Sequence, residues 1–205
     1  MEPIIIRLAA VLVGYLLGNI QTAYVVAKRL RGVDIREYGS GNSGTTNVTR
    51  LLGLKIGVGV FCVDALKTIL AFVIAESLLG PIAPGMAGMY AGAGVVLGHN
   101  FPFHMRFRGG KGAASTIGLM LCTDWRVILI QIAVGLAGVS STRMVSVGSL
   151  AITASFPVML LLFGYNIEIV GIGVFLWALA WYMHRGNIQR ILAGTERRIG
   201  SKKSA

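Results

Sequence analysis

Long apolar segments separated by short polar ones define the pattern of this 205-residue chain. The apolar segments cover residues 4–27, 56–79, 82–97, 113–122, 127–139, 145–162 and 167–183. A helix of about 20 apolar residues is long enough to cross the roughly 30 Å hydrocarbon core of a bilayer. The pattern therefore predicts an all-α, polytopic integral membrane protein.

The number of spans depends on residues 113–139, which a polar sequence at 123–126 interrupts. This stretch forms either one long helix or two short ones. With two helices, the polar segments at one side are 28–55, 99–111, 140–143 and 184–205. Those segments hold all but three of the 19 Lys and Arg residues, as the positive-inside rule requires of a cytoplasmic face. We therefore predict seven transmembrane helices, two of them short, with the N-terminus outside and the C-terminus cytoplasmic.

The two short helices, 113–122 and 127–139, would each be about 15–20 Å long, less than the thickness of the hydrocarbon core. Neighbouring helices must shield them, or the bilayer must be thinned around them. Either arrangement brings the loop that precedes residue 113 toward the depth of the acyl chains. The first apolar segment has its cations after it, which predicts a retained span and not a cleaved signal peptide.

The composition fits a membrane protein, because 55% of the residues are hydrophobic and only 13% are charged, against about 25% charged in a soluble domain. Topology and anionic lipid head groups explain the net charge of +11, and scattered cations without interleaved aromatic residues argue against nucleic-acid binding. No His and acidic residues are grouped at ligand spacing, so we expect no metal and no cofactor. We expect one domain over residues 1–205, with a basic cytoplasmic tail at about 185–205.

A first polar motif runs from Ser40 through Asn42, Thr46 and Asn47 to Arg50. The glycines within it let the backbone approach a ligand and turn N–H groups toward an anion. Its Ser, Thr and Asn side chains add neutral donors, and Arg50 adds a guanidinium that binds phosphate or carboxylate in bidentate geometry. The alternative is a flexible loop without a ligand.

A second motif, Gly109-Gly110-Lys111-Gly112, precedes a helix that we expect to begin at Ala113. The N–H groups of the loop and the helix dipole would face an anion there. The spacing is not that of a Walker A loop, so nucleotide binding is not implied. Because both motifs lie on the same predicted side, they indicate an anion site at the lipid surface.

Two charged residues, Asp64 and Lys67, lie within the second span on one helical face. Charges inside a membrane are costly and mark functional candidates. We favour an internal ion pair that also holds a neighbouring loop. His99, at the end of the third span, is expected to orient its loop by hydrogen bonding more than to act in catalysis, and Glu76 is expected to be interfacial.

Further polar residues lie at the ends of the last two spans. Ser146 falls in the first turn of the helix 145–162, where its hydroxyl either faces an anion or caps the helix. His184 and Asn187 are three residues apart at the end of the last span, so they share a face.

Together these segments resemble the bacterial acyl-phosphate:glycerol-3-phosphate acyltransferases. Residues 40–50 look like the first motif of that family, 99–112 like the second and 140–149 like the third, and 184–188 with 194–196 resemble its end piece. The resemblance covers nearly the whole chain, including the seven-span layout. Thr45, Ala113 and Met144 stand where alanine, valine and an aromatic residue are usual.

The resemblance implies transfer of a fatty acyl group from acyl phosphate to the 1-hydroxyl of sn-glycerol 3-phosphate. The products are lysophosphatidic acid and inorganic phosphate, at the first step of phospholipid synthesis. Both substrates carry phosphate, which fits two anion-binding motifs. The residues five positions after the three histidines are His104, Gly109 and Gln189, so no His–Asp pair of the kind used by other glycerolipid acyltransferases is present.

Acyl phosphate has a good leaving group, so we expect direct attack by the glycerol hydroxyl without a covalent acyl-enzyme. Ser40 and Arg50 are predicted to bind glycerol 3-phosphate, and His184 with Asn187 to orient it. The base is either His184 or the phosphate of acyl phosphate, and we favour the substrate phosphate. The groups predicted to hold phosphate are Lys111, Ser146, Asn42 and the N–H groups of Gly109, Gly110 and Gly112, and the binding set also includes Thr46 and Asn47.

The competing hypothesis is a transporter of a phosphorylated or anionic metabolite, with Asp64 and Lys67 as its coupling site. Transporters usually have repeated halves around a midplane site, whereas this sequence has no evident repeat and its polar clusters lie at one face. We expect the bacterial cytoplasmic (inner) membrane as location, with the active site facing the cytoplasm. The expected partners are acyl phosphate, glycerol 3-phosphate and membrane lipids, and an enzyme that forms acyl phosphate is a candidate functional partner.

Overall fold

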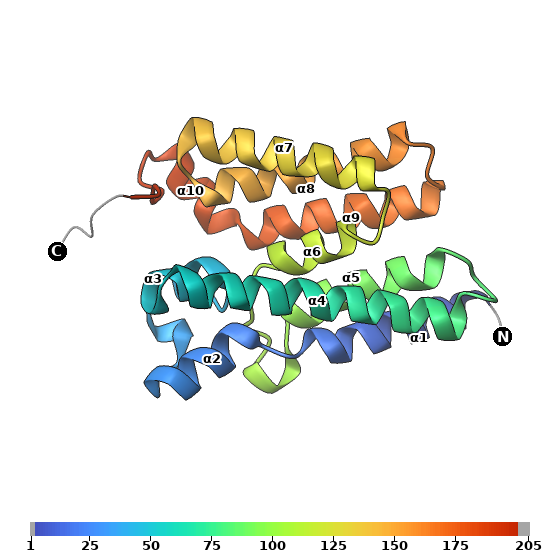
Figure 1. The fold of residues 1–205 in the computed structure, drawn as a ribbon, viewed down its shortest axis with the longest axis horizontal. Helices are drawn as coiled ribbons and strands as arrows, with labels where there is room; N and C mark the ends of the chain where they lie inside the picture. Colours follow the sequence, from blue (N-terminus) through green and yellow to red (C-terminus); the bar gives the residue numbers. More distant parts are fainter. Residues whose placement is uncertain (1–2, 201–205) are drawn as a thin grey trace. The chain divides into compact units, whose positions relative to one another are not determined.

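The protein is all-helical over residues 3–200, the part of the chain that its structure, a computed structural model, describes (Figure 1). The first unit, residues 3–123, and the second, residues 124–200, are each compact. The first holds α1 (Pro3–Gly18), α2 (Thr22–Arg31), η1 (Ile35–Glu37), α3 (Thr45–Leu52), α4 (Leu54–Leu79), α5 (Met86–Asn100), η2 (Phe103–Met105) and α6 (Ala113–Met120). The second holds α7 (Trp125–Thr142), α8 (Val145–Leu162), α9 (Ile167–Met183) and α10 (Arg185–Leu192). The last five residues of the predicted basic tail, 201–205, lie outside the described residues.

Several of these helices are long and apolar enough to cross a membrane. Four segments qualify among the described residues, Ile4–Arg31, Leu54–Leu79, Trp125–Thr142 and Val145–Leu162. A fifth results if α9 and α10, which meet at 61°, form one bent span. Leu8, Leu12 and Leu16 of α1 are each more than half exposed, as expected of side chains that face lipid. The all-α membrane architecture is confirmed, while the count of seven and the orientation stay predictions.

Helix α5 forms the core of the first unit, where it packs against α1, α4 and α6. Two of its glycines, Gly94 and Gly98, lie directly on the backbone of α1. A methyl group on Gly94 would overlap the carbonyl oxygen of Val11, and one on Gly98 would overlap that of Tyr15. Small residues that let helix backbones approach closely are a usual means of helix association in membranes.

The first span is broken at residues 19–21, although the sequence predicted one helix over 4–27. Inside a membrane, the carbonyl groups freed by such a break need other donors. Lys67 of α4 supplies one, because its Nζ donates to the carbonyl oxygen of Ile20 at 2.8 Å and lies 3.5 Å from that of Gly18. The prediction of one continuous helix over 4–27 was therefore wrong. The predicted role of Lys67 in holding a neighbouring loop is confirmed.

Glu76 has a capping role that the sequence analysis missed. The third span begins at Met86, later than the predicted 82, because residues 80–85 form turns. The Glu76 carboxylate accepts the N–H groups of Gly85 at 2.5 Å and Gly88 at 2.9 Å. It therefore satisfies N–H groups at the start of α5 that have no partner within the helix.

The polar interruption at 123–126 separates two helices, α6 and α7, as predicted. Asp124 is the N-cap of α7, and its carboxylate accepts the N–H of Arg126 at 2.8 Å. The N–H of Asp124 donates to the hydroxyl of Tyr165 at 2.9 Å, which ties this turn to the loop before α9. Helix α6 has only eight residues and is therefore about 12 Å long, which confirms that it is short. Helix α7 has 18 residues, about 27 Å, and is long enough to span a membrane, so the prediction of a second short helix over 127–139 was wrong.

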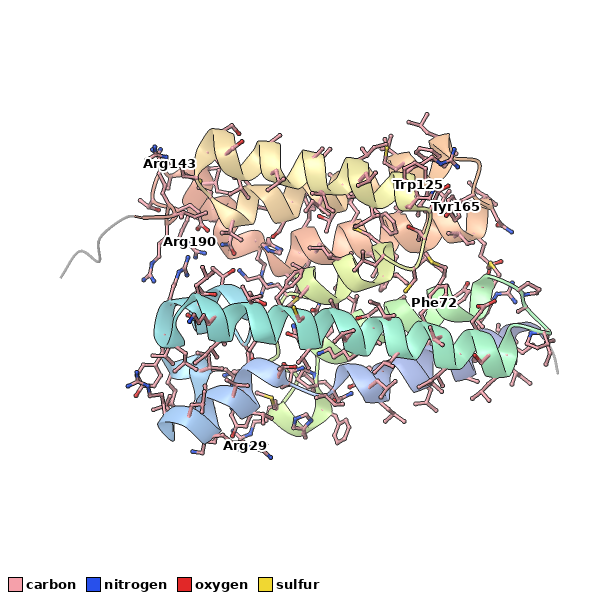
Figure 2. All side chains as sticks on the ribbon, in the orientation of Figure 1. Arg29, Phe72, Trp125, Arg143, Tyr165 and Arg190 are labelled. Carbon is pink, nitrogen blue, oxygen red and sulfur yellow. The ribbon has the colours of Figure 1, made fainter. Side chains whose placement is uncertain are left out.

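The second unit has chemically different ends. Helix α8 packs against both α7 and α9. Figure 2 shows Arg143 and Arg190 at the end of this unit where α7 finishes, and Trp125 and Tyr165 at the opposite end. Cations gathered at one end are what the positive-inside rule expects of helices with one cytoplasmic end.

Candidate active site

Asn47 shapes the first motif, in which a turn-rich loop leads into α3. The motif is thus helical from Thr45 onward, where the sequence analysis expected a loop. The buried Asn47 amide accepts the N–H of Ser40 at 3.0 Å through Oδ1. Its Nδ2 donates to the carbonyl oxygens of Ile35 at 3.0 Å and Tyr38 at 2.8 Å. One side chain therefore fastens three backbone positions, and its predicted direct contact with substrate stays a prediction.

The other predicted residues of the first motif lie nearer the surface. Ser40 and Arg50 are exposed, and Asn42 and Thr46 are half-buried. Thr46 is in the first turn of α3, and Arg50 is in its last turn. The exposed hydroxyl and guanidinium are accessible to an anion, with the buried Asn47 amide beneath them as the support of the loop.

The second motif folds back on the end of α5. The N–H of Gly109 donates to the carbonyl oxygen of Asn100 at 3.1 Å, and that of Gly110 donates to the carbonyl oxygen of His99 at 3.0 Å. Both N–H groups already donate to carbonyl oxygens at the end of α5, so a ligand could bind them only if these hydrogen bonds broke. Gly112 caps α6 with a φ of 76°, a conformation that favours glycine. An anion would therefore meet the N–H groups at the start of α6 first.

Gly110 is the point where the two motifs meet. A methyl group there would overlap the carbonyl oxygen of Ser43, in the first motif, and also Nε2 of His99. No side chain fits at this position without a shift of its neighbours. The structure thus brings the two predicted anion-binding motifs into contact within the first unit.

A chain of buried polar side chains runs from behind Gly110 into α4. Nδ1 of His99 lies 2.9 Å from Nζ of Lys67, and Nζ lies 2.8 Å from Oδ1 of Asp64. The hydroxyl of Thr22 donates to the same carboxylate oxygen at 2.8 Å. Because an ammonium only donates, Nδ1 of His99 accepts, and Nε2 carries the proton of the neutral imidazole. The predicted ion pair is confirmed, and it supports the side chain on which the glycine loop rests.

Buried polar atoms without a hydrogen-bond partner gather around His99 and the two motifs in the described part of the chain. They belong to Gln21, Ser43, Thr45, Asp64 and Asn100. Both amide atoms of Asn100 lack a partner, and its Oδ1 lies against Gly112. Such atoms are costly and normally pair with water or a ligand. They are the donors and acceptors that a polar molecule reaching these loops would satisfy.

In the second unit, Glu196 joins two of the predicted site residues. Its Oε1 accepts the hydroxyl of Ser146 at 2.8 Å and Nδ2 of Asn187 at 2.6 Å. Its Oε2 accepts Nε of Arg190 at 2.7 Å. Ser146 lies in the first turn of α8, as predicted. The carboxylate therefore connects the start of α8 with α10.

The environment of Glu196 keeps it ionised at neutral pH. Burial of the carboxylate raises its pKa, but the hydrogen bonds from Asn187, Ser146 and Arg190 outweigh burial and hold the pKa below its usual range. The sequence analysis gave Glu196 no role. The signal that could have found it is that it is the sole acidic residue in the otherwise basic segment 184–205.

His184 begins α10 at the bend after α9. Its Nδ1 lies 2.8 Å from the carbonyl oxygen of Ala180. A carbonyl oxygen only accepts, so Nδ1 carries the proton and Nε2 is the acceptor of the neutral ring. The imidazole is buried at this bend.

The predicted site residues fall into two groups along the chain. The first unit holds Ser40, Asn42, Thr46, Asn47, Arg50, Gly109, Gly110, Lys111 and Gly112, and the second holds Ser146, His184 and Asn187. Within the first unit the two motifs touch, and within the second Ser146 and Asn187 share Glu196. Apolar helices that carry glycine-, hydroxyl- and cation-rich loops define a helical membrane protein with candidate sites for an anionic ligand.

Comparison with known proteins gives the family. Residues 8–194 match the family model described as glycerol-3-phosphate acyltransferase. A protein of that name from Clostridioides difficile (strain 630) is 45% identical over 193 residues, which cover 93% of this chain and 94% of the relative. One from Thermoanaerobacter sp. (strain X514) is 40% identical over 191 residues, with the same coverage.

Solved structures agree with the sequence relatives. PlsY, an integral membrane glycerol 3-phosphate acyltransferase, is similar in its glycerol 3-phosphate form with a TM-score of 0.87 at 39% identity, over 95% of this chain and 96% of that one. Its lysophosphatidic acid form gives a TM-score of 0.84 over 95% of each chain. This chain belongs to the glycerol-3-phosphate acyltransferase family and is an integral membrane protein, which confirms the resemblance found in its motifs.

Proposed function

We propose that this protein transfers a fatty acyl group from acyl phosphate to the 1-hydroxyl of sn-glycerol 3-phosphate. The observation that carries the proposal is its family membership, with relatives of that name about 40% identical over more than nine-tenths of the chain. The similar PlsY structures are of glycerol 3-phosphate and lysophosphatidic acid forms, the acceptor and product of the proposed reaction. The reaction takes place in the bacterial cytoplasmic membrane, with the site open to the cytoplasm, in a single seven-span domain.

The reaction needs no covalent acyl-enzyme. The oxygen of the glycerol 1-hydroxyl attacks the acyl carbonyl carbon, a new ester bond forms, and the bond from that carbon to the phosphate oxygen breaks. The hydroxyl proton leaves with inorganic phosphate. Because phosphate is a good leaving group, the protein contributes mainly positioning and stabilisation of negative charge.

The polar groups of each unit support distinct roles. In the first unit, Lys111 with the start of α6 and Asn42 hold phosphate, and Ser40 with Arg50 binds glycerol 3-phosphate. In the second unit, Ser146 contributes to phosphate binding, and His184 with Asn187 orients the acceptor.

The base is the phosphate of acyl phosphate, with His184 as the orienting group. In this proposal His184 positions the glycerol 3-phosphate and does not take the hydroxyl proton. We therefore expect His184→Ala to raise KM for glycerol 3-phosphate at least as much as it lowers kcat. A fall in kcat alone would identify His184 as the general base.

The transporter alternative loses its main support. It required Asp64 and Lys67 as a coupling site, and these two residues instead pair with each other and hold the break after α1. No observation here favours transport over acyl transfer.

The proposal is tested by phosphate release from palmitoyl phosphate. The purified protein in lipid is assayed with and without glycerol 3-phosphate, alongside Lys111→Ala and, as matched control, Lys55→Ala. Lys55 is an exposed lysine at the start of α4, outside both motifs. We expect release that depends on glycerol 3-phosphate, is lost in Lys111→Ala and is kept in Lys55→Ala.

The other outcomes separate the alternatives. Equal release without the acceptor would identify a hydrolase. Lysophosphatidic acid formed from palmitoyl-CoA but not from palmitoyl phosphate would retain the acyltransferase and exclude the proposed donor. No product from either donor, with uptake of glycerol 3-phosphate into vesicles, would identify a transporter.

A further inference from the structure

A hollow of about 490 Å³ lies in the first unit, and none of its lining residues belongs to the two motifs at residues 40–50 and 109–112. It is bordered by the end of the first broken span, η1 and the loop after α5. Its lining residues are Tyr24, Asp34, Arg36, Glu37, His104, Met105, Arg106 and Arg108. Sites for small ligands have volumes of about 300–1,000 Å³, so the hollow is large enough for a polar head group.

Arg36 is one of the residues that line the hollow. Its guanidinium makes a bidentate pair with Asp34, with the closer contact at 2.6 Å, and donates to the carbonyl oxygen of Met105 at 3.2 Å. It also lies over the ring of Tyr24, 5.6 Å from the ring centroid. Arg36 therefore joins η1 to the loop after α5, and Asp34 neutralises its charge.

Arg106 and Arg108 bring charge to the rim. Both are exposed, and neither side chain forms an ion pair or hydrogen bond with another of the described residues 3–200. Against these two guanidiniums the lining offers a single remaining carboxylate, Glu37. The open side of the hollow is therefore cationic and suits a phosphate group.

Aromatic side chains extend from the same loop. Phe103 and Phe107 are 57% and 60% exposed, and they alternate with the two arginines along the chain, so the expectation that no aromatic residues lie among the cations was wrong for this loop. Arg106 and Phe107 are consecutive residues with positive φ, 55° and 57°. Bulky residues rarely adopt this conformation, and such strained turns cluster at functional sites. Exposed aromatic rings beside cations are typical of segments that enter the interface of an anionic membrane.

We propose that this hollow binds the phosphate group of an anionic membrane lipid. Arg106 and Arg108 hold the phosphate, and Phe103 and Phe107 contact the upper acyl chains of the same leaflet. Free phosphate shares the head-group chemistry but would leave the two phenylalanines without a role. This lipid-binding site is distinct from the acyltransferase site proposed above, and its test does not depend on acyltransferase activity.

The test measures lipid capture directly. The full chain is placed in phosphatidylcholine nanodiscs with a small fraction of photoreactive phosphatidylglycerol, and the crosslinked residues are mapped after illumination. The double variant Arg106→Gln with Arg108→Gln is compared with Arg29→Gln with Arg31→Gln, which removes the same charge from the exposed end of α2. Arg106→Lys with Arg108→Lys keeps the charge, and thermal unfolding shows that every variant is folded.

We expect crosslinking within residues 103–108, reduced about tenfold in the Arg106/Arg108→Gln variant, because it loses the charge-assisted hydrogen bonds to the phosphate, and little changed in the other two. Equal loss in the α2 variant would mean that only general surface charge attracts lipid, and would overturn the proposal. Loss of crosslinking on addition of millimolar inorganic phosphate, with no effect of Phe103→Ser and Phe107→Ser, would assign the hollow to free phosphate instead.

Discussion

Nζ of Lys67 lies 2.9 Å from Nδ1 of His99, so a charge in the middle of a membrane helix contacts the residue that supports the glycine loop. The same ammonium pairs with Asp64 and donates to the carbonyl oxygen of Ile20. One buried group therefore joins α4, the break in the first span and the end of α5. Because Gly110 rests against His99, these intramembrane charges determine the position of the second motif through packing.

Lys67→Met should destabilise the protein strongly, because it leaves the Asp64 carboxylate buried without its counter-ion. Removing one partner of a buried ion pair typically costs about 3–5 kcal/mol. The measurement is equilibrium or thermal unfolding in mild detergent. Lys55→Met, which removes an exposed lysine from the same helix, should change stability by less than about 0.5 kcal/mol.

The double variant Asp64→Leu with Lys67→Met separates charge from packing. An apolar replacement of the whole pair leaves no uncompensated charge, so it should be more stable than Lys67→Met alone. If the double variant were less stable than Lys67→Met, the buried charge would not be the cause of the loss. The freed carbonyl groups at Gly18 and Ile20 would then be the better explanation.

Gly110→Ala should abolish most of the activity without unfolding the protein. The added methyl group overlaps Ser43 and His99, so the two motifs must separate. A displacement of about 1 Å in a positioning loop costs on the order of 100-fold in rate. Gly59→Ala is the matched control, because a methyl group at Gly59 meets nothing within 4 Å. Steady-state kinetics with both substrates measures the effect, and equal activity of the two variants would refute the close approach.

The regular helices could be predicted from the sequence, because uninterrupted apolar periodicity determines them. The predicted bounds 145–162 and 167–183 are those of α8 and α9, and α4 differs by two residues at its start. The break at 19–21 was missed because its cause, a donor from Lys67, lies 47 residues away from Ile20 along the chain. Local patterns do not reveal which distant side chain will satisfy a freed carbonyl group.

The candidate site was predictable as residue types but not as contacts. Glycine, hydroxyl and cation motifs identified both loops, because an anion site needs those groups. The sequence did not reveal that Asn47 faces inward to hold its loop, or that Glu196 gathers Ser146 and Asn187. Both roles depend on chain reversals, at η1 and after α10, whose geometry has no periodic signal.

Asn47→Ala should raise KM for glycerol 3-phosphate more than it lowers kcat. The substitution removes the partner of the Ser40 N–H and one of the two N–H donors to each of the Ile35 and Tyr38 carbonyl oxygens, and a lost hydrogen bond of this kind typically costs about 0.5–1.5 kcal/mol. The loop that carries Ser40 would then be displaced. Steady-state kinetics at varied glycerol 3-phosphate measures this.

Asn166→Ala is the control for Asn47→Ala. Asn166 caps α9 by accepting the N–H of Glu168 at 2.7 Å, so its loss should cost about 1 kcal/mol of stability with KM unchanged. An equal rise in KM in both variants would show that general destabilisation is responsible. In that case Asn47 would have no specific role in the loop.

Glu196→Gln should lower stability at neutral pH by about 2 kcal/mol, because hydrogen bonds to a charged acceptor are stronger than those to a neutral one. The folded protein holds the pKa of Glu196 below its ordinary 4.5, so the carboxylate contributes stability that is fully present above about pH 4.5. That contribution disappears as the pH falls through the lower pKa of the folded state. The difference in unfolding free energy between the wild type and Glu196→Gln should therefore be constant from pH 7 to pH 5 and shrink below pH 4.5. Glu37→Gln removes an exposed carboxylate and should have little effect at neutral pH. If the difference in unfolding free energy between the wild type and Glu196→Gln stayed unchanged below pH 4.5, the shape of the Glu196 side chain, and not its charge, would hold Ser146, Asn187 and Arg190 together.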